Sequence, residues 1–129
     1  MPNILLIEPD QVLADIYSQS MTKAGHKVMV RAGAQTAIMA ADELKPDLVI
    51  IELQLVEHSG IEFLYEFRSY ADWRGIPVIV HSHVPVNEFD GSHDLLKNEL
   101  GVETYLYKPQ TSLRQLIDAI DVQLAAITS

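Results

Sequence analysis

Cysteine is absent from this sequence, and positive charge is scarce. The 129 residues include 9 Lys and Arg against 18 Asp and Glu, which gives a formal net charge of -9 at pH 7. Without cysteine the chain has neither a disulfide framework nor thiolate chemistry. Nucleic-acid binding requires clustered Lys and Arg to contact phosphates, so the acidic balance argues against a DNA or RNA partner.

Long apolar runs and targeting signals are absent as well. No apolar run reaches the roughly 18 residues of a membrane span. The first residues lack the basic, apolar and small-residue succession of a signal peptide. We therefore expect a cytoplasmic protein with no membrane partner. The composition is 48% apolar and 21% charged, which is typical of a globular chain, and 129 residues suffice for one domain with a real core.

Short apolar runs predict strands that are buried on both faces. They are Asn3–Ile7 (NILLI), Leu48–Ile51 (LVII) and residues 76–80 (IPVIV). Runs of this length, rich in β-branched residues, are typical of central strands in a parallel sheet with helices on both sides. The first two runs stop at a carboxylate, Glu8 and Glu52 respectively. Lys27–Arg31 and Val102–Tyr107 read as two further strands, the former at the edge of the sheet.

Helical periodicity fills the segments between these strands. The predicted helices are one capped by Asp10 and stopped by Gly25, and others over residues 33–44, 61–73, 92–100 and 113–127. Regular alternation of strands and helices implies right-handed crossovers and a parallel sheet. The expected fold is therefore α/β, a three-layer α-β-α sandwich around a five-stranded parallel sheet, in one domain over residues 1–129.

In such a sheet the carboxyl ends of all strands meet at one edge, where open α/β folds place their ligands. The polar residues expected there are Glu8 and Asp10 after the first strand, Glu52 after the third, Ser82 after the fourth and Lys108 after the fifth. An unpaired ammonium at the end of a buried strand is costly. We therefore expect an ion pair between Glu52 and Lys108, with the Ser82 hydroxyl beside it. A Glu52 side chain that simply points to water is the plainer alternative.

Four motifs in this order resemble the receiver domain of two-component response regulators. They are Glu8 at the end of ILLI, the strand PDLVIIELQL, IPVI followed by Ser82, and YLYKP. The resemblance covers nearly the whole chain. It implies a flavodoxin-like (βα)5 fold in a single receiver-like domain without an output domain, and a signalling role in place of enzyme activity.

The resemblance also implies roles for individual residues. Glu52 stands at the phosphoacceptor position, Glu8 and Asp10 form the acidic pocket, Ser82 and Lys108 are the partners of a phosphoryl group, and Tyr105 is the switch aromatic. In the family, two acidic residues after the first strand hold Mg²⁺. Here the second of these positions is Pro9, which has no oxygen ligand to offer.

The departures from the family pattern shape the functional expectation. Glu52 replaces an aspartate, so its carboxylate lies roughly 1.5 Å further out, and a displacement of ~1 Å can cost about a hundredfold in an in-line reaction. Pro9 leaves a poor Mg²⁺ site, for which Glu8, Asp10 and Glu52 are the only candidate ligands, and Asp10 is also the expected helix cap. His83 follows Ser82, where the family usually has a small residue.

The leading hypothesis is a stand-alone atypical receiver, or pseudo-receiver, that uses no cofactor and acts by phosphorylation-independent protein–protein interaction. Its partner surface would run from about Ser92 to Leu124, by analogy with the family, and the same surface could pair two copies in a homodimer. The alternative is a functional single-domain response regulator that is phosphorylated with Mg²⁺ on Glu52 or Asp10. An unrelated nucleotide binder is disfavoured, because no Gly-rich turn follows the first strand.

Histidines supply the last candidate site. His58, His81 and His83 are expected on loops at the same edge as Glu8 and Glu52. Imidazole suits Zn²⁺ or Ni²⁺, and a histidine cluster can also sense pH. No tight pair spacing on a helix supports a metal site, so ordinary exposed loop histidines are the expected outcome.

Overall fold

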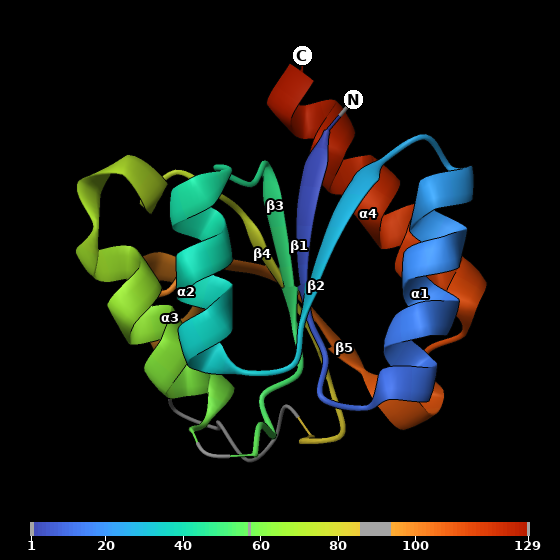
Figure 1. Cartoon of the computed structure of the whole chain (residues 1–129), viewed down its shortest axis with the longest axis horizontal. Helices are drawn as coiled ribbons and strands as arrows, with labels where there is room; N and C mark the ends of the chain where they lie inside the picture. Colours follow the sequence, from blue (N-terminus) through green and yellow to red (C-terminus); the bar gives the residue numbers. More distant parts are fainter. Residues whose placement is uncertain (1, 57, 86–93, 129) are drawn as a thin grey trace.

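Five parallel strands form one sheet in the order β2-β1-β3-β4-β5, as the computed structural model shows for residues 2–56, 58–85 and 94–128 (Figure 1). The strands are β1 Asn3–Ile7, β2 Lys27–Arg31, β3 Leu48–Ile51, β4 Val78–Ser82 and β5 Val102–Tyr107. The helices are α1 Gln11–Lys23, α2 Ala34–Glu43, α3 Gly60–Ser69 and α4 Leu113–Thr128, with the short turns η1 Ala71–Trp73, η3 Leu95–Glu99 and η4 Lys108–Gln110. The predicted α-β-α sandwich is confirmed.

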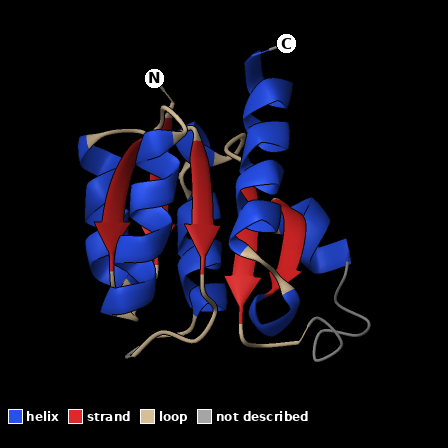
Figure 2. Cartoon of the chain, turned by 90° about the vertical axis from the view of Figure 1, so that its right-hand side faces the viewer, coloured by secondary structure: helices blue, strands red, loops and turns tan. Residues whose placement is uncertain are grey.

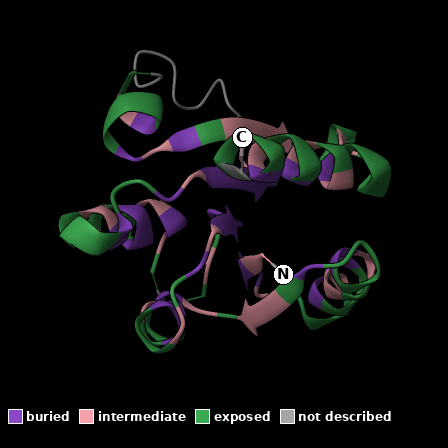
Figure 3. Ribbon diagram, turned by 90° about the horizontal axis from the view of Figure 1, so that it is seen from above, coloured by how far each residue is buried: buried purple, intermediate pink, exposed green. Residues whose placement is uncertain are grey.

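Side chains of the central strands pack alternately into two hydrophobic cores. In β1, Leu5 and Ile7 belong to the core under α2, α3 and η3, while Ile4 and Leu6 belong to the core under α1 and α4. Successive side chains of a strand point to opposite faces, so a strand covered on both sides must be apolar at every position. Figure 3 shows helices on both sides of the sheet.

Two element boundaries differ from the sequence expectation. The fourth strand is β4 Val78–Ser82 instead of residues 76–80, so the strand ends at the fully buried Ser82. The third helix ends at Ser69 because Tyr70 adopts an extended backbone (φ -90°, ψ 123°), and η1 follows as a separate turn. The start of the helix expected over residues 92–100 lies outside the described residues, and its described part contains η3. Among the described residues, no helix is long and apolar enough to cross a bilayer.

Arg68, at the end of α3, connects several backbone segments at the amino edge of the sheet by hydrogen bonds. Its guanidinium donates hydrogen bonds to the carbonyl oxygens of Leu100 (2.9 Å), Trp73 (2.5 Å) and Ile76. Gly101 has a φ of +71°, and a Cβ there would collide with the guanidinium. The positive charge of Arg68 is thus directed into the molecule, toward backbone dipoles, instead of toward solvent.

Candidate functional site

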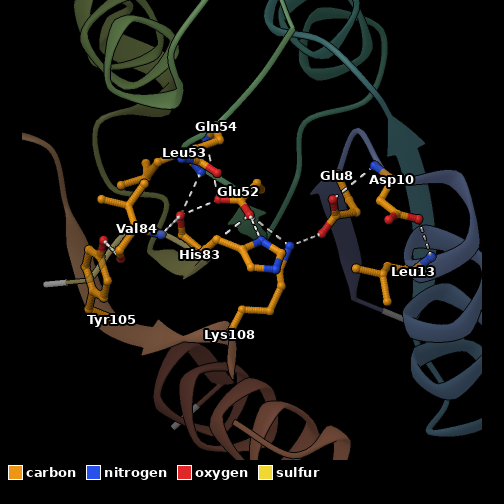
Figure 4. A network of polar contacts seen from close by, with 11 residues as sticks. Glu8, Asp10, Leu13, Glu52, Leu53, Gln54, His83, Val84, Tyr105 and Lys108 are labelled. Carbon is orange, nitrogen blue, oxygen red and sulfur yellow. Dashed lines mark hydrogen bonds and ion pairs between the residues drawn. The ribbon is translucent and has the colours of Figure 1, made fainter. Parts of the chain in front are cut away.

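The strands all point to one edge of the sheet (Figure 2), and the side chains of Glu8, Glu52 and Lys108 meet there (Figure 4). Lys108 Nζ lies 2.5 Å from Glu8 Oε1 and 2.9 Å from Glu52 Oε1. The lysine side chain is 6% exposed, and each glutamate side chain is 3% exposed. The predicted ion pair between Glu52 and Lys108 is present, and Glu8 joins it as a second carboxylate.

Sheet topology explains why residues so far apart in sequence meet. β1 and β3 are neighbours, so the residues that follow them lie side by side. Their backbones are held by ladder hydrogen bonds that continue past the strands, from Glu8 N to Arg31 O and from Glu52 N to Ile7 O, both 3.0 Å long. Lys108 begins η4 directly after β5, and its long side chain crosses β4 to reach both carboxylates.

Both oxygens of the Glu52 carboxylate are occupied by groups of the same chain. Oε1 accepts from Lys108 Nζ and from the backbone N–H of His83 (3.2 Å), and it lies 3.0 Å from His83 Nδ1. Oε2 accepts from the Ser82 hydroxyl and from the backbone N–H of Gln54 (3.2 Å). A carboxylate offers about four lone-pair positions, so Glu52 has little capacity left for another ligand.

Glu52 is ionised in this setting. Burial opposes ionisation, yet the hydrogen bonds from Ser82, Lys108 and His83 outweigh it and lower the pKa of the Glu52 carboxyl to about 2. Burial also disfavours the charged form of Lys108, but its hydrogen bonds to Glu8 and Glu52 raise the pKa of the ammonium above its ordinary value. Two carboxylates against one ammonium leave the pocket with a net negative charge, which repels any anion that approaches it.

Ser82 connects Glu52 to the segment after β4. Its hydroxyl oxygen accepts hydrogen bonds from the backbone N–H groups of Val84 (3.0 Å) and Leu53 (3.4 Å), and the hydroxyl donates a hydrogen bond to Glu52. The Tyr105 hydroxyl in turn donates to the Val84 carbonyl oxygen at 2.6 Å. Tyr105, the residue at the predicted switch position, is thus linked to Glu52 through Ser82 and Val84.

Asp10 lies apart from this network. Its side chain accepts a hydrogen bond from the backbone N–H of Leu13 at 3.1 Å, which confirms the prediction that it caps α1. The residue is exposed, and only its backbone N–H contacts the pocket, through a 3.1 Å hydrogen bond to Glu8 Oε2. Figure 4 shows the Asp10 carboxylate turned toward α1 and away from Glu52.

The residues present do not fit Mg²⁺, the cation that the family resemblance implies. This ion requires near-octahedral oxygen ligands. Pro9 offers no side-chain oxygen, Asp10 caps a helix, and the Lys108 ammonium already bridges the two carboxylates that a cation would use. In the described part of the chain, no group of three or more His, Cys, Asp or Glu side chains is placed to hold a metal ion.

The three histidines expected at this edge do not converge. His58 lies beside Glu62, with His58 Nδ1 3.2 Å from Glu62 Oε2. The expectation that His81 lies on a loop is wrong, because it is a buried residue of β4 that packs edge-on against the Tyr17 ring. Burial, helped by the nearby Lys108 charge, lowers the pKa of His81 to about 4, so it is neutral at pH 7. Only His83 contacts Glu52.

Comparisons with known proteins agree on one family. The model of the response regulator receiver domain matches residues 4–121. The KDP operon transcriptional regulatory protein KdpE of Escherichia coli is 30% identical over 109 residues, which are 84% of this chain and 45% of that protein. The polar-differentiation response regulator DivK of Brucella anthropi is 25% identical over 118 residues, 92% of each chain. The chain spans about half the length of the transcriptional regulators that it matches.

Solved structures show the same fold. A CheY-like receiver domain protein from Methanospirillum hungatei superimposes with a TM-score of 0.84 at 20% identity, over 98% of this chain and 95% of that one. The chemotaxis protein CheY4 of Vibrio cholerae superimposes with a TM-score of 0.82 at 18% identity, over 94% and 97%. The flavodoxin-like fold expected from the sequence is confirmed.

Replacing Lys108 should destabilise the fold more than any other single charge removal in the pocket. In Lys108→Met the carboxylates of Glu8 and Glu52 lose their shared cation while they stay buried, which typically costs about 3–5 kcal/mol. Urea unfolding would measure the loss, and the double variant Lys108→Met/Glu52→Gln should recover part of it. The exposed Lys97→Met serves as the control, and equal stability of the two lysine variants would refute a structural role for the bridge.

Glu52 should also contribute to the pH dependence of stability. Its pKa is about 2 in the folded chain against an ordinary 4.5, so its contribution is complete above pH 4.5 and is lost as the pH falls toward 2. A shift of this size corresponds to about 3 kcal/mol. Unfolding free energies of wild type and Glu52→Gln should differ above pH 4.5 and converge near pH 2, with exposed Glu103→Gln as control. A gap that does not change with pH would contradict the assignment.

Proposed function

The chain belongs to the family of response regulator receiver domains, and from this premise we propose that it is a pseudo-receiver that acts by phosphorylation-independent protein–protein interaction. Receiver domains are signalling modules of two-component systems. The proposal is supported above all by Glu52, the residue at the phosphoacceptor position, whose two oxygens are both bound within the chain.

Phosphorylation would require Glu52 to give up these bonds. The attacking oxygen needs a free lone pair and an in-line approach to phosphorus, and small displacements are costly for such a step. Ser82 and Lys108, which the family pattern assigns to phosphoryl oxygens, here bind the Glu52 carboxylate itself. The longer glutamate side chain thus uses the hydrogen-bond donors that an incoming phosphoryl group would need.

The second candidate is a working single-domain response regulator with Mg²⁺. In its favour, Ser82 and Lys108 are retained at the family's phosphoryl-binding positions, and the match to DivK of Brucella anthropi covers 92% of both chains. Against it stand Pro9 and the use of Asp10 as a helix cap. The two candidates differ in whether a covalent phosphoryl adduct forms.

Intact mass after incubation with a small acyl phosphate and Mg²⁺ separates them. We expect wild type to gain no phosphoryl group, because the Glu52 oxygens are occupied and no Mg²⁺ site fits. The double variant Pro9→Asp/Glu52→Asp, which restores the family pattern, should gain one. A phosphorylated wild type would refute the proposal, and peptide mapping would then locate the group on Glu52 or Asp10.

We place the partner surface over the described part of the segment from Ser92 to Leu124, namely η3, β5 and α4. Tyr105 on β5 links this surface to the pocket through Val84, and Val122 on α4 is 66% exposed. Homodimerisation through the same surface is the alternative use, and it would appear as a dimer in sedimentation velocity.

A charge and polarity change on this surface should abolish partner capture. With the immobilised chain as bait, proteins retained by wild type should be lost in Glu103→Lys/Val122→Asp. The matched variant Asp15→Lys/Ile16→Asp places the same kinds of change on α1, where both residues are also exposed, and it should retain them. If only the α1 variant lost the captured proteins, the interaction would belong to α1, and the placement on β5 and α4 would be refuted.

A further inference from the structure

A second surface, formed by α2 and α3, is separate from the pocket and from the surface described above. We call it the α2–α3 face and define it by Gln35, Met39, Val56, Glu62, Glu66 and Tyr70. The two helices contact each other on the side of the sheet opposite α1 and α4 (Figure 1). Nothing proposed for Glu52 depends on this face.

Hollows lie at both ends of the helix pair. At the carboxyl edge of the sheet, hollows of about 220 Å³ and 160 Å³ share the walls Ala34, Gln35 and His58. Toward the other edge, a hollow of about 210 Å³ lies between α2 and the end of α3, beside Met39. Each is smaller than the ~300–1,000 Å³ typical of a small-molecule site, so each suits one side chain of a partner.

Apolar side chains stand exposed beside these hollows. Val56 is 85% exposed, Met39 is 62% exposed and Tyr70 is 46% exposed. Val56 lines the hollow at the carboxyl edge, and the other two line the hollow toward the amino edge. Gln35 lines the hollows at the carboxyl edge and Met39 lines the one toward the amino edge. These two residues are four apart on α2, so they lie on the same side of this helix. A docked amphipathic helix likewise presents its side chains at i and i+4 on one side.

Carboxylates outnumber cations on the two helices of this face, and Arg31 of β2 lines a neighbouring hollow with Met39 and Glu43. The helices α2 and α3 contain the carboxylates of Asp42, Glu43, Glu62 and Glu66, and their one cation is Arg68. Arg68 is turned toward backbone carbonyl oxygens, as described above, so it does not neutralise these carboxylates at the surface. Glu62 and Glu66 lie one helical turn apart in the wall of the same hollow.

We propose that the α2–α3 face binds an amphipathic, positively charged helix of a partner protein. Its apolar residues would enter the hollows beside Val56 and Met39, and a Lys or Arg would pair with Glu62 and Glu66. A second copy of this chain is a poor occupant, because its net charge is -9 and its like-charged surface would be repelled.

A synthetic helical peptide with Leu at i and i+4 and flanking Lys residues is the probe. In an NMR titration of the ¹⁵N-labelled full chain, the largest amide shifts should fall on Gln35, Met39, Val56 and Glu62. A peptide with Glu in place of each Lys should not bind. The variant Glu62→Gln/Glu66→Gln should weaken binding by about fivefold or more, since two exposed ion pairs are lost.

The matched control is Asp15→Asn/Asp118→Asn, which removes two carboxylates from α1 and α4 and gives the same net charge as the test variant. Equal weakening by both variants would mean general attraction to an acidic protein and would overturn the proposal, as would shifts centred on α1, β5 or α4. Sedimentation velocity without peptide should give the same result for wild type and for Glu62→Gln/Glu66→Gln. A dimer that the Glu62→Gln/Glu66→Gln variant dissociates would assign the face to a second copy and overturn the proposal as well.

Discussion

The Lys108 ammonium between the carboxylates of Glu8 and Glu52 is the interaction on which the rest of the pocket depends. Parallel pairing of β1 and β3 forces the two acids together at the same edge of the sheet, where both are buried. Like charges at close range oppose each other's ionisation. One cation in hydrogen-bond contact with both removes this conflict, and Lys108, directly after β5, supplies it.

One methylene group, the difference between glutamate and aspartate, sets where the carboxylate at position 52 lies. The glutamate side chain at position 52 brings its carboxylate against the Ser82 hydroxyl and the His83 backbone, so donors at the edge of the sheet are satisfied within the chain. From Ser82 the hydrogen bonds continue through Val84 to Tyr105. Because the pKa of Glu52 is about 2, this connection does not depend on pH in the neutral range.

Local sequence signals predicted the helices and strands. Features that depend on contacts between distant segments of the chain were predicted less well. Apolar runs that stop at Glu8 and Glu52 located both strands and their polar ends, and Asp10 was identified as a cap, because these features involve neighbouring residues. His81 was misplaced because strand length depends on pairing with β5, which extends to Ser82. Arg68 gave no signal at all, since its carbonyl partners come from separate segments of the chain.

The acidity of the surface follows from composition, 18 Asp and Glu against 9 Lys and Arg, and the placement of one cation strengthens it locally. The chain has 9 Lys and Arg, and two of them, Lys108 and Arg68, are directed inward, one to buried carboxylates and the other to backbone carbonyl oxygens. Lys108 is buried together with two carboxylates, so its inward position does not make the surface more acidic. Arg68 has a local effect, because it belongs to α3 and its charge is turned away from the face that presents Glu62 and Glu66. The hydrogen bonds by which Arg68 closes the amino edge of the sheet therefore also keep its charge away from Glu62 and Glu66, the carboxylates to which we assign the partner's cation.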